Sequence, residues 1–320
     1  MTILYPFIFR PIFKERVWGG RNLERLYAKP LPPGPPIGES WEISDRPGDV
    51  SVIANGPLAG KDLHWLVEHH GPELLGPVPP LHGRFPMLCK ILDAQDKLSL
   101  QVHPPAAVAA ELNGEPKTEM WYIADATPEA ELYVGLKRGV TRAEFEKRVA
   151  DGSVARCFHQ VRVKTGDAMF LPSGRVHAIG AGNVIFEIQQ NSDTTYRVYD
   201  WGRPREVHLA QSLASIDFTD FEPSLLKTRY SRNEVIKTRY LVDDPLFHVD
   251  GCQVKRGQRF YLRNDAPTIL ALLKGRLTVS YEGQDLPVSA GAFVLLPAVL
   301  GRVALTAETQ IEFLQVQPGR

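Results

Sequence analysis

The same short pattern occurs twice in this chain. Residues 166–177 read GDAMFLPSGRVH, and residues 291–302 read GAFVLLPAVLGR. Each copy starts with a glycine, which permits a tight turn, and continues through an apolar run to a proline, which ends the run. The first copy ends at His177, whereas the second has Arg302 at the same place. Two copies of one β unit predict two related β domains, of which only the first has a histidine at this point.

Glycine and proline punctuate the whole chain. There are 26 of each, and the short runs of β-branched and aromatic residues between them are typical of an all-β architecture. A length of 320 residues exceeds an average domain and favours two. We place the boundary in the polar segment 219–240, which gives domains 1–235 and 236–320. The proline-rich stretch 29–38 is expected to form a surface loop, because proline cannot donate to a sheet.

A few short helices are expected beside the β core. Residues 141–152 read TRAEFEKRVADG, in which Thr141 and Glu144 form a capping box. Residues 62–71 carry an apolar stripe and are expected to end at the Gly-Pro step that closes this stretch. The third candidate helix is 206–215. These helices would support a β core without forming a layer of their own.

The composition argues against several kinds of partner. The 37 basic side chains balance 37 acidic ones, so no overall field favours nucleic acid or an anionic membrane surface. No apolar stretch reaches the roughly 18 residues of a membrane span, and the N-terminus lacks the features of a signal peptide. Three cysteines without a CxxC spacing suit a reducing compartment. We therefore expect a cytoplasmic protein, and a net charge of zero leaves its oligomeric state open.

Polar residues with metal-binding chemistry interrupt three of the apolar runs. The stretch LSLQVHP contains Gln101 and His103, which share one face if the stretch is a strand. By the same alternation, KTEMWYIAD puts Lys117 and Glu119 on one face, and the repeated pattern adds His177. Two imidazoles, a carboxylate and an amide oxygen form a mixed set that suits Zn²⁺ with room for water or substrate. Against this interpretation, an isolated histidine in an apolar strand is more often an ordinary core residue.

The repeated pattern and the polar runs resemble a known family. Residues 166–177 match the second motif of the cupin barrel, and Gln101, His103 and Glu119 fall where its first motif supplies ligands. The longer resemblance is to the short bacterial form of type I mannose-6-phosphate isomerase, nearly throughout the chain to about residue 260. Ala181 stands where an asparagine often ends the second motif, and Gln101 replaces a cupin histidine, as is typical of this family. The resemblance is carried by KERVWGG, GESWEIS, QVHP, KTEMWY, PSGRVHAIG and QQNSDTTYRVYDWGR.

The resemblance implies a fold and an activity. It implies two cupin (jelly-roll) β-barrel domains: a catalytic metal-binding domain, 1–235, with short helical insertions, and a degenerate domain, 236–320, without metal ligands. The implied reaction interconverts D-mannose 6-phosphate and D-fructose 6-phosphate through a cis-enediol. The implied cofactor is one Zn²⁺ per chain, although other divalent metals remain possible. Its expected ligands are Gln101, His103, Glu119 and His177.

Three further residues are candidates for catalysis. Arg197 is the arginine that the family places in the pocket; it cannot act as a base, but its charge can hold an enediolate. Lys117 can bind the substrate phosphate or a sugar hydroxyl, or simply pair with a carboxylate near Glu119. Glu187 can serve as a base or orient Arg197. Each also has a plain alternative as a solvated or ion-paired residue.

Two other classes of function stay open at this point. A cupin with free metal positions can be an iron-dependent oxygenase, and a cupin can also bind a sugar without catalysis. Nucleotide binding is not supported, because the chain has no GxGxxG after a strand and GPLAGKD does not match the spacing of a phosphate loop. Assaying isomerisation with and without a chelator separates all three classes.

Overall fold

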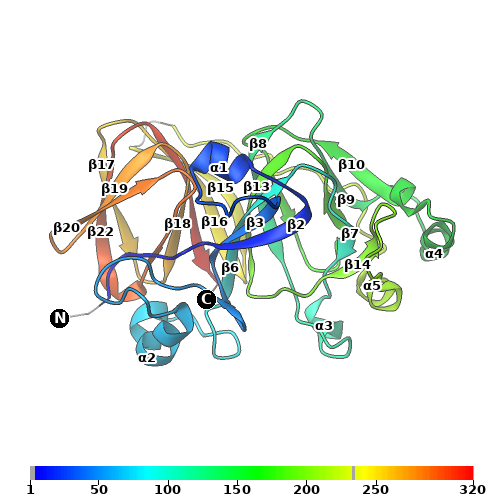
Figure 1. Ribbon diagram of the computed structural model, residues 1–320, viewed down its shortest axis with the longest axis horizontal. Coiled ribbons are helices and arrows are strands. Elements are labelled where there is room, and N and C mark those ends of the chain that lie inside the picture. Colours follow the sequence, from blue (N-terminus) through cyan, green and yellow to red (C-terminus); the bar gives the residue numbers. More distant parts are fainter. Residues whose placement is uncertain (1–3, 233–234, 320) are drawn as a thin grey trace.

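The computed structural model describes residues 4–232 and 235–319 and shows a mostly β protein with five short or medium α-helices in that part of the chain. Figure 1 shows two β bodies lying side by side along the longest axis of the molecule. Each body contains one pair of sheets. The expectation of a β protein with few helices is therefore confirmed. The expected domain boundary at 235 adjoins residues 233–234, which lie outside the described residues.

The first sheet pair is built from the N-terminal two thirds of the chain. Its six-stranded sheet has the order β11 (Ala168–Leu171), β8 (Glu119–Ala126), β13 (Asn183–Gln190), β6 (Met87–Ala94), β3 (Ile37–Ile43) and β2 (Ile12–Gly20). Its five-stranded sheet has the order β10 (Phe158–Arg162), β9 (Glu131–Leu136), β12 (His177–Ile179), β7 (Leu100–Val102) and β14 (Tyr196–Tyr199).

The second sheet pair takes most of its strands from the C-terminal third. Its six-stranded sheet has the order β1 (Phe7–Ile8), β21 (Phe293–Leu296), β18 (Thr268–Lys274), β23 (Ile311–Pro318), β16 (Phe247–Val254) and β15 (Ile236–Asp244). Its four-stranded sheet has the order β17 (Arg259–Asn264), β22 (Gly301–Ala307), β19 (Arg276–Tyr281) and β20 (Gln284–Ser289). The N-terminal strand β1 thus pairs with β21 and ties the chain start to the second sheet pair. A small separate sheet joins β4 (Asp45–Arg46) to β5 (Asp49–Val50).

The central six-stranded sheet of the first pair is buried on both faces. One face of β6, β8 and β13 packs inside the first sheet pair, with Trp121, Ile123 and Ile185 in one apolar cluster. The opposite face belongs to the large core that continues into the second sheet pair, where Phe186 stacks on Phe293 with ring centroids 5.4 Å apart. Strand alternation therefore sends neighbouring residues of these strands to two different environments.

The helices lie around the sheets, as Figure 1 shows. Helix α4 (Arg142–Ala150) begins as expected, since the Thr141 side chain accepts a hydrogen bond from the Glu144 N–H. Helix α5 (Leu209–Ser215) falls within the third expected segment. The unexpected helical elements include α1 (Asn22–Tyr27), α3 (Ala106–Ala109) and a 3₁₀ turn at Val154–Cys157.

Helix α2 (Leu63–Leu75) starts after Asp62, whose side chain accepts from the Trp65 N–H, but its expected end at residue 71 is wrong. The chain kinks at His70, where φ is −138°, and then makes another helical turn that contains Pro72. Proline is tolerated in the first turn of a helix because its missing N–H would have no partner there. The kink lets a second helical segment start at a residue that would stop a continuous helix.

The two copies of the repeated pattern end differently in space. His177 starts β12 and is buried inside the first sheet pair. In the second copy a 3₁₀ helix, Ala298–Leu300, follows the proline, and the next strand turns Val303 into the core. Arg302 therefore lies on the exposed face, with its guanidinium 3.8 Å from the centre of the Tyr261 ring. No helix in the described ranges is long and apolar enough to cross a membrane.

Candidate metal centre

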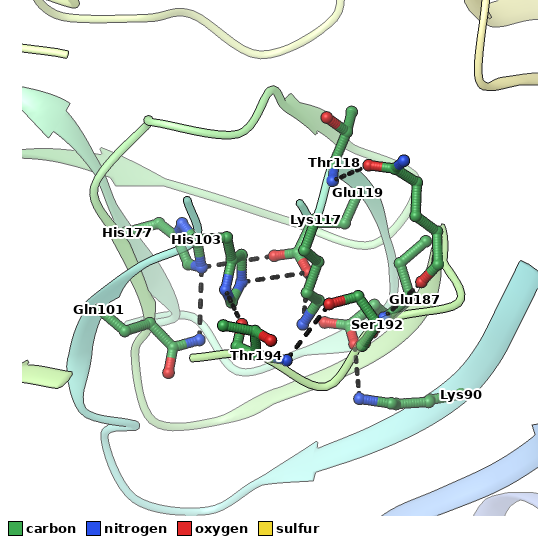
Figure 2. Close-up of polar contacts among 12 residues, drawn as sticks. Lys90, Gln101, His103, Lys117, Thr118, Glu119, His177, Glu187, Ser192 and Thr194 are labelled. Carbon is green, nitrogen blue, oxygen red and sulfur yellow. Dashed lines mark hydrogen bonds and ion pairs between the residues drawn. The ribbon is translucent and has the colours of Figure 1, made fainter. Parts of the chain in front are cut away.

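Three buried side chains converge inside the first sheet pair. One ligand atom each from His103, Glu119 and His177 lies within 4.8 Å of the others. His177 and Gln101 are directly opposite each other on β12 and β7, and Glu119 opens β8 on the facing sheet. Figure 2 shows these side chains turned toward one another; His103 directly follows β7, while Glu119 and His177 belong to β8 and β12. The pairing of β12 with β7 thus unites residues that are far apart in the sequence.

The alternation of polar and apolar residues explains why these side chains face inward. Leu100 and Val102 pack into an apolar cluster on the outer face of the five-stranded sheet, so Gln101 between them faces the interior. On β8, Met120 belongs to the core shared with the second sheet pair, so Glu119 faces the opposite way. The sequence prediction that alternation gives Gln101 and His103 a common face agrees with this arrangement.

Hydrogen bonds set the tautomer of both histidines. Nδ1 of His103 lies 2.8 Å from the Thr194 carbonyl oxygen, and Nδ1 of His177 lies 2.9 Å from the Arg175 carbonyl oxygen. A carbonyl only accepts, so each Nδ1 carries the hydrogen and each Nε2 carries a lone pair. This orientation by an outer hydrogen bond is typical of metal-ligating histidines.

The Nε2 lone pairs of His103 and His177 both face the Glu119 carboxylate, and neither Nε2 carries a hydrogen to donate to it. Nε2 of His103 lies 3.6 Å from Glu119 Oε2, and Nε2 of His177 lies 3.4 Å from Glu119 Oε1. Among the described residues, His103 Nε2 and Glu119 Oε1 are buried without a hydrogen-bond partner, and Glu119 Oε2 has the Lys117 ammonium beside it. Buried acceptors that face each other are costly unless a cation lies between them. The donor set therefore fits a divalent metal ion.

Gln101 completes the set after a rotation of its amide. Its Nε2 atom lies 3.3 Å from His177 Nε2. Turning the amide over about its last bond exchanges nitrogen and oxygen with almost no change in shape, and it points the oxygen at the same centre. Gln101 can therefore supply the fourth ligand, an oxygen.

Lys117 sets the protonation of the cluster, with its Nζ 2.9 Å from Glu119 Oε2. Burial alone would raise the pKa of Glu119, but the charge of Lys117 is the main cause that outweighs burial and holds this pKa well below its usual value. Burial, aided by Lys117, lowers the pKa of His103 to about 4, and burial also lowers the pKa of His177. At neutral pH both imidazoles are neutral and Glu119 is ionised, which is the state that binds metal.

Arg197 lies on the strand next to that of Gln101, on the side away from His177. Strand β14 pairs with β7 so that Arg197 is opposite Gln101, and cross-strand partners share a face of the sheet. Its Nη1 donates to the Glu206 carbonyl oxygen at 2.6 Å, while its Nε is buried and has no hydrogen bond in the described structure. The register thus brings Arg197 to the same interior face, but no direct contact joins it to the His103–Glu119–His177 cluster.

A second polar group lies on the facing sheet and consists of Glu187, Lys90 and Glu39. Glu187 is the member of this group that is a candidate for catalysis. It lies opposite Trp121 on β8 and opposite Lys90 on β6. Its Oε2 accepts from the Trp121 indole N–H at 2.9 Å, and its Oε1 lies 3.3 Å from Lys90 Nζ. Lys117 connects this group to the metal cluster, because the charges of Glu119 and Glu187 together raise its pKa against the lowering effect of burial.

Sequence reasoning missed two buried charges in this region. Lys90 is 4% exposed and Glu39 is 8% exposed, and they approach to 3.9 Å beside Arg16, whose Nε lies 2.8 Å from Glu39. Burial alone would raise the pKa of Glu39, but Lys90 and Arg16 outweigh it and lower this pKa to about 2. The available signal was a charged residue inside an apolar strand, as in FPMLCKIL, which is costly to bury without a partner.

The fold and site together define a β-sandwich protein with a buried site whose donors suit a divalent metal ion. Residues 7–145 match the family model described as phosphomannose isomerase type I, catalytic domain. Mannose-6-phosphate isomerase from Streptococcus mutans is 36% identical to this chain, over 91% of this chain and 92% of the relative. ManA, the mannose-6-phosphate isomerase of Bacillus subtilis, is also 36% identical, over 94% and 95%. The chain belongs to the type I mannose-6-phosphate isomerase family and is an enzyme of that class.

Solved structures agree with this assignment. A crystal structure of mannose 6-phosphate isomerase from Bacillus subtilis matches with a TM-score of 0.89 and 30% identity, covering 98% of this chain and all (100%) of that one. A mannose 6-phosphate isomerase bound with zinc and yttrium matches with a TM-score of 0.78 over 99% of this chain. At 17% identity, this second likeness is one of fold.

Proposed function

We propose that this chain interconverts D-mannose 6-phosphate and D-fructose 6-phosphate with one Zn²⁺ held by Gln101, His103, Glu119 and His177. The observation that carries the proposal is the convergence of two imidazole lone pairs on a buried, ionised carboxylate. Zinc accepts such a mixed nitrogen and oxygen set and retains room for substrate. The curated relatives are named for this isomerisation, which supports the choice of substrate.

We also take the two sheet pairs as two cupin barrels. On this proposal, residues 1–235 form the catalytic domain and residues 236–320 form a degenerate domain without metal ligands. The repeated glycine and proline pattern supports a common origin of the two units. Arg302, which stands where the first copy has His177, lies on the outer face of its sheet and so offers nothing to the interior.

The proposed chemistry moves a proton between two carbons of the sugar. Aldose and ketose interconvert through a cis-enediol, so a proton leaves C2 and arrives at C1 while negative charge builds on the sugar oxygens. When bound, the metal ion would supply positive charge beside those oxygens. The residues of this chain supply the remaining steps, and each role below follows from charge and position.

Glu187 is assigned as the group that accepts and returns the proton. The Trp121 indole N–H donates to one of its oxygens and Lys90 Nζ lies beside the other, so the direction of the carboxylate is fixed. Lys117 carries an ammonium group 2.9 Å from Glu119, and its pKa is also raised by the charge of Glu187; it is assigned to a sugar hydroxyl or the phosphate. Arg197 cannot accept a proton and is assigned to hold the negative charge of the enediolate.

The test is an isomerisation assay with the purified protein. Mannose 6-phosphate is added before and after treatment with a chelator, and fructose 6-phosphate is measured. Activity should be lost with chelator and restored with Zn²⁺ or Mn²⁺. Failure to turn over after metal is restored would end the isomerase proposal. Oxygen consumption with a small organic acid would instead indicate an oxygenase, and sugar binding without turnover would indicate a binding protein.

A further inference from the structure

Trp121 joins the metal cluster to the second polar group. It lies on β8, two residues after Glu119, and is 1% exposed. Its ring meets the His177 ring edge to face, with centroids 5.3 Å apart and an interplanar angle of 84°. The indole N–H of the same residue donates to Glu187 Oε2 at 2.9 Å. One side chain therefore contacts both a candidate metal ligand and the candidate proton acceptor.

The sheet register makes this contact specific. Trp121 and Glu187 are direct cross-strand partners on β8 and β13, so their side chains leave the same face of the sheet side by side. The other Glu187 oxygen lies 3.3 Å from Lys90 Nζ. With one donor at each oxygen, rotation of the carboxylate about its last bond is opposed from both sides. A lysine ammonium alone would leave that rotation free, because it is a point charge on a flexible chain.

We propose that Trp121 is a positioning residue whose indole N–H aims the Glu187 carboxylate at the substrate. This inference rests on the role assigned to Glu187 in the proposed function. The simpler alternative is that Trp121 only fills the apolar interior, since its ring also belongs to a buried cluster with Ile123 and Ile185. The two explanations differ in what the N–H contributes, because filling the interior does not require a donor.

The test is a double-mutant cycle on kcat with zinc-loaded enzyme. The variants are Trp121→Phe, which keeps an aromatic ring and removes the donor, Glu187→Gln, and the two together. Trp121→Phe should lower kcat about tenfold or more, the loss expected when a hydrogen bond to a charged group is removed. Its KM and zinc content should stay within about twofold of wild type. The double variant should be no slower than Glu187→Gln, because Trp121 acts through that carboxylate.

The possible results distinguish the positioning role of Trp121 from the catalytic role of Glu187 on which it rests. If Glu187→Gln keeps the wild-type kcat, the role assigned to Glu187 fails and the inference falls with it. If Glu187→Gln is slow but the double variant loses the product of the two single effects, Trp121 acts independently and the inference alone is overturned. A wild-type kcat in Trp121→Phe would also overturn it. Trp65→Phe, on α2 and outside both polar groups, is the matched control and should keep its kcat.

A second variant covers the case in which Trp121→Phe does not fold. Replacing Trp121 with benzothienylalanine keeps the size and shape of the indole but puts sulfur in place of the N–H group. The folded variant should show the same fall in kcat with unchanged zinc content. A wild-type kcat in this isostere would show that only the shape of the ring matters and would refute the proposed positioning role.

Discussion

Glu39→Gln should reduce the loss of unfolding free energy that the protein undergoes as the pH falls into the acidic range. Glu39 is 8% exposed and lies near Lys90 and Arg16, which lower its pKa from 4.5 to about 2. A carboxyl group whose pKa is lowered by folding stabilises the native state above its unfolded pKa, and this contribution is lost as the pH falls toward the folded pKa. The window therefore runs from about pH 4.5 down to about pH 2. At about 1.36 kcal/mol for each pKa unit, the contribution is about 3 kcal/mol.

The assay is urea unfolding at a series of pH values between about 6 and about 2.5, with chelator present so that metal release does not contribute. At neutral pH the variant should be less stable, because Lys90 and Arg16 lose a buried counter-charge. The difference in unfolding free energy between wild type and Glu39→Gln should then shrink by about 2 to 3 kcal/mol as the pH falls.

The control and the refuting result are well defined for this experiment. Glu146→Gln removes the same charge from an exposed pair with Arg142 on α4 and should change stability by no more than about 0.5 kcal/mol. If wild type and Glu39→Gln lose stability in parallel across the whole pH range, the buried charges around Glu39 do not behave as described. The reasoning about this polar group would then be wrong.

Three further predictions concern the metal centre. His103→Ala and His177→Ala should each abolish bound zinc, measured by elemental analysis; full retention in both would remove the proposed site. Arg197→Ala should keep zinc and lose most of its turnover, and a wild-type kcat would refute its assigned role. Lys117→Met should raise the pKa of Glu119, so that protons displace metal at a higher pH; the midpoint of metal loss should rise by about one pH unit. An unchanged midpoint would show that Lys117 does not control this carboxylate.

The sequence predicted local structure correctly where that structure depends on residues only a few positions apart. The helix start at Thr141 depends on residues three apart, and the Thr141 side chain caps the Glu144 N–H as expected, although the Glu144 side chain pairs with Arg148 and does not complete the capping box. The strand alternation around Gln101 depends on residues two apart and agrees with the structure. The end of α2 was misjudged because Pro72 stops a continuous helix but can stand in the first turn after a kink, and the kink at His70 depends on packing.

The second polar group shows why the roles of Lys90 and Trp121 could not be predicted from the sequence. A lysine within an apolar run, such as Lys90, can lie at a strand edge or be buried with a partner. Its partners Glu39 and Glu187 come from β3 and β13, and the pairing of those strands with β6 is not visible in a single sequence. Trp121 is similar, because the sequence does not show whether a tryptophan N–H has a carboxylate as its hydrogen-bond partner.

The sequence by itself determined the β character of the chain, the common face of Gln101 and His103 and the chemical types of the donors, because these depend on composition and on a period of two residues. The tertiary structure decided which strands lie side by side. It brought His177 opposite Gln101, set Glu119 on the facing sheet, placed Trp121 beside Glu187 and turned Arg302 outward. These outcomes depend on long-range strand pairing and on burial, and no local pattern specifies either.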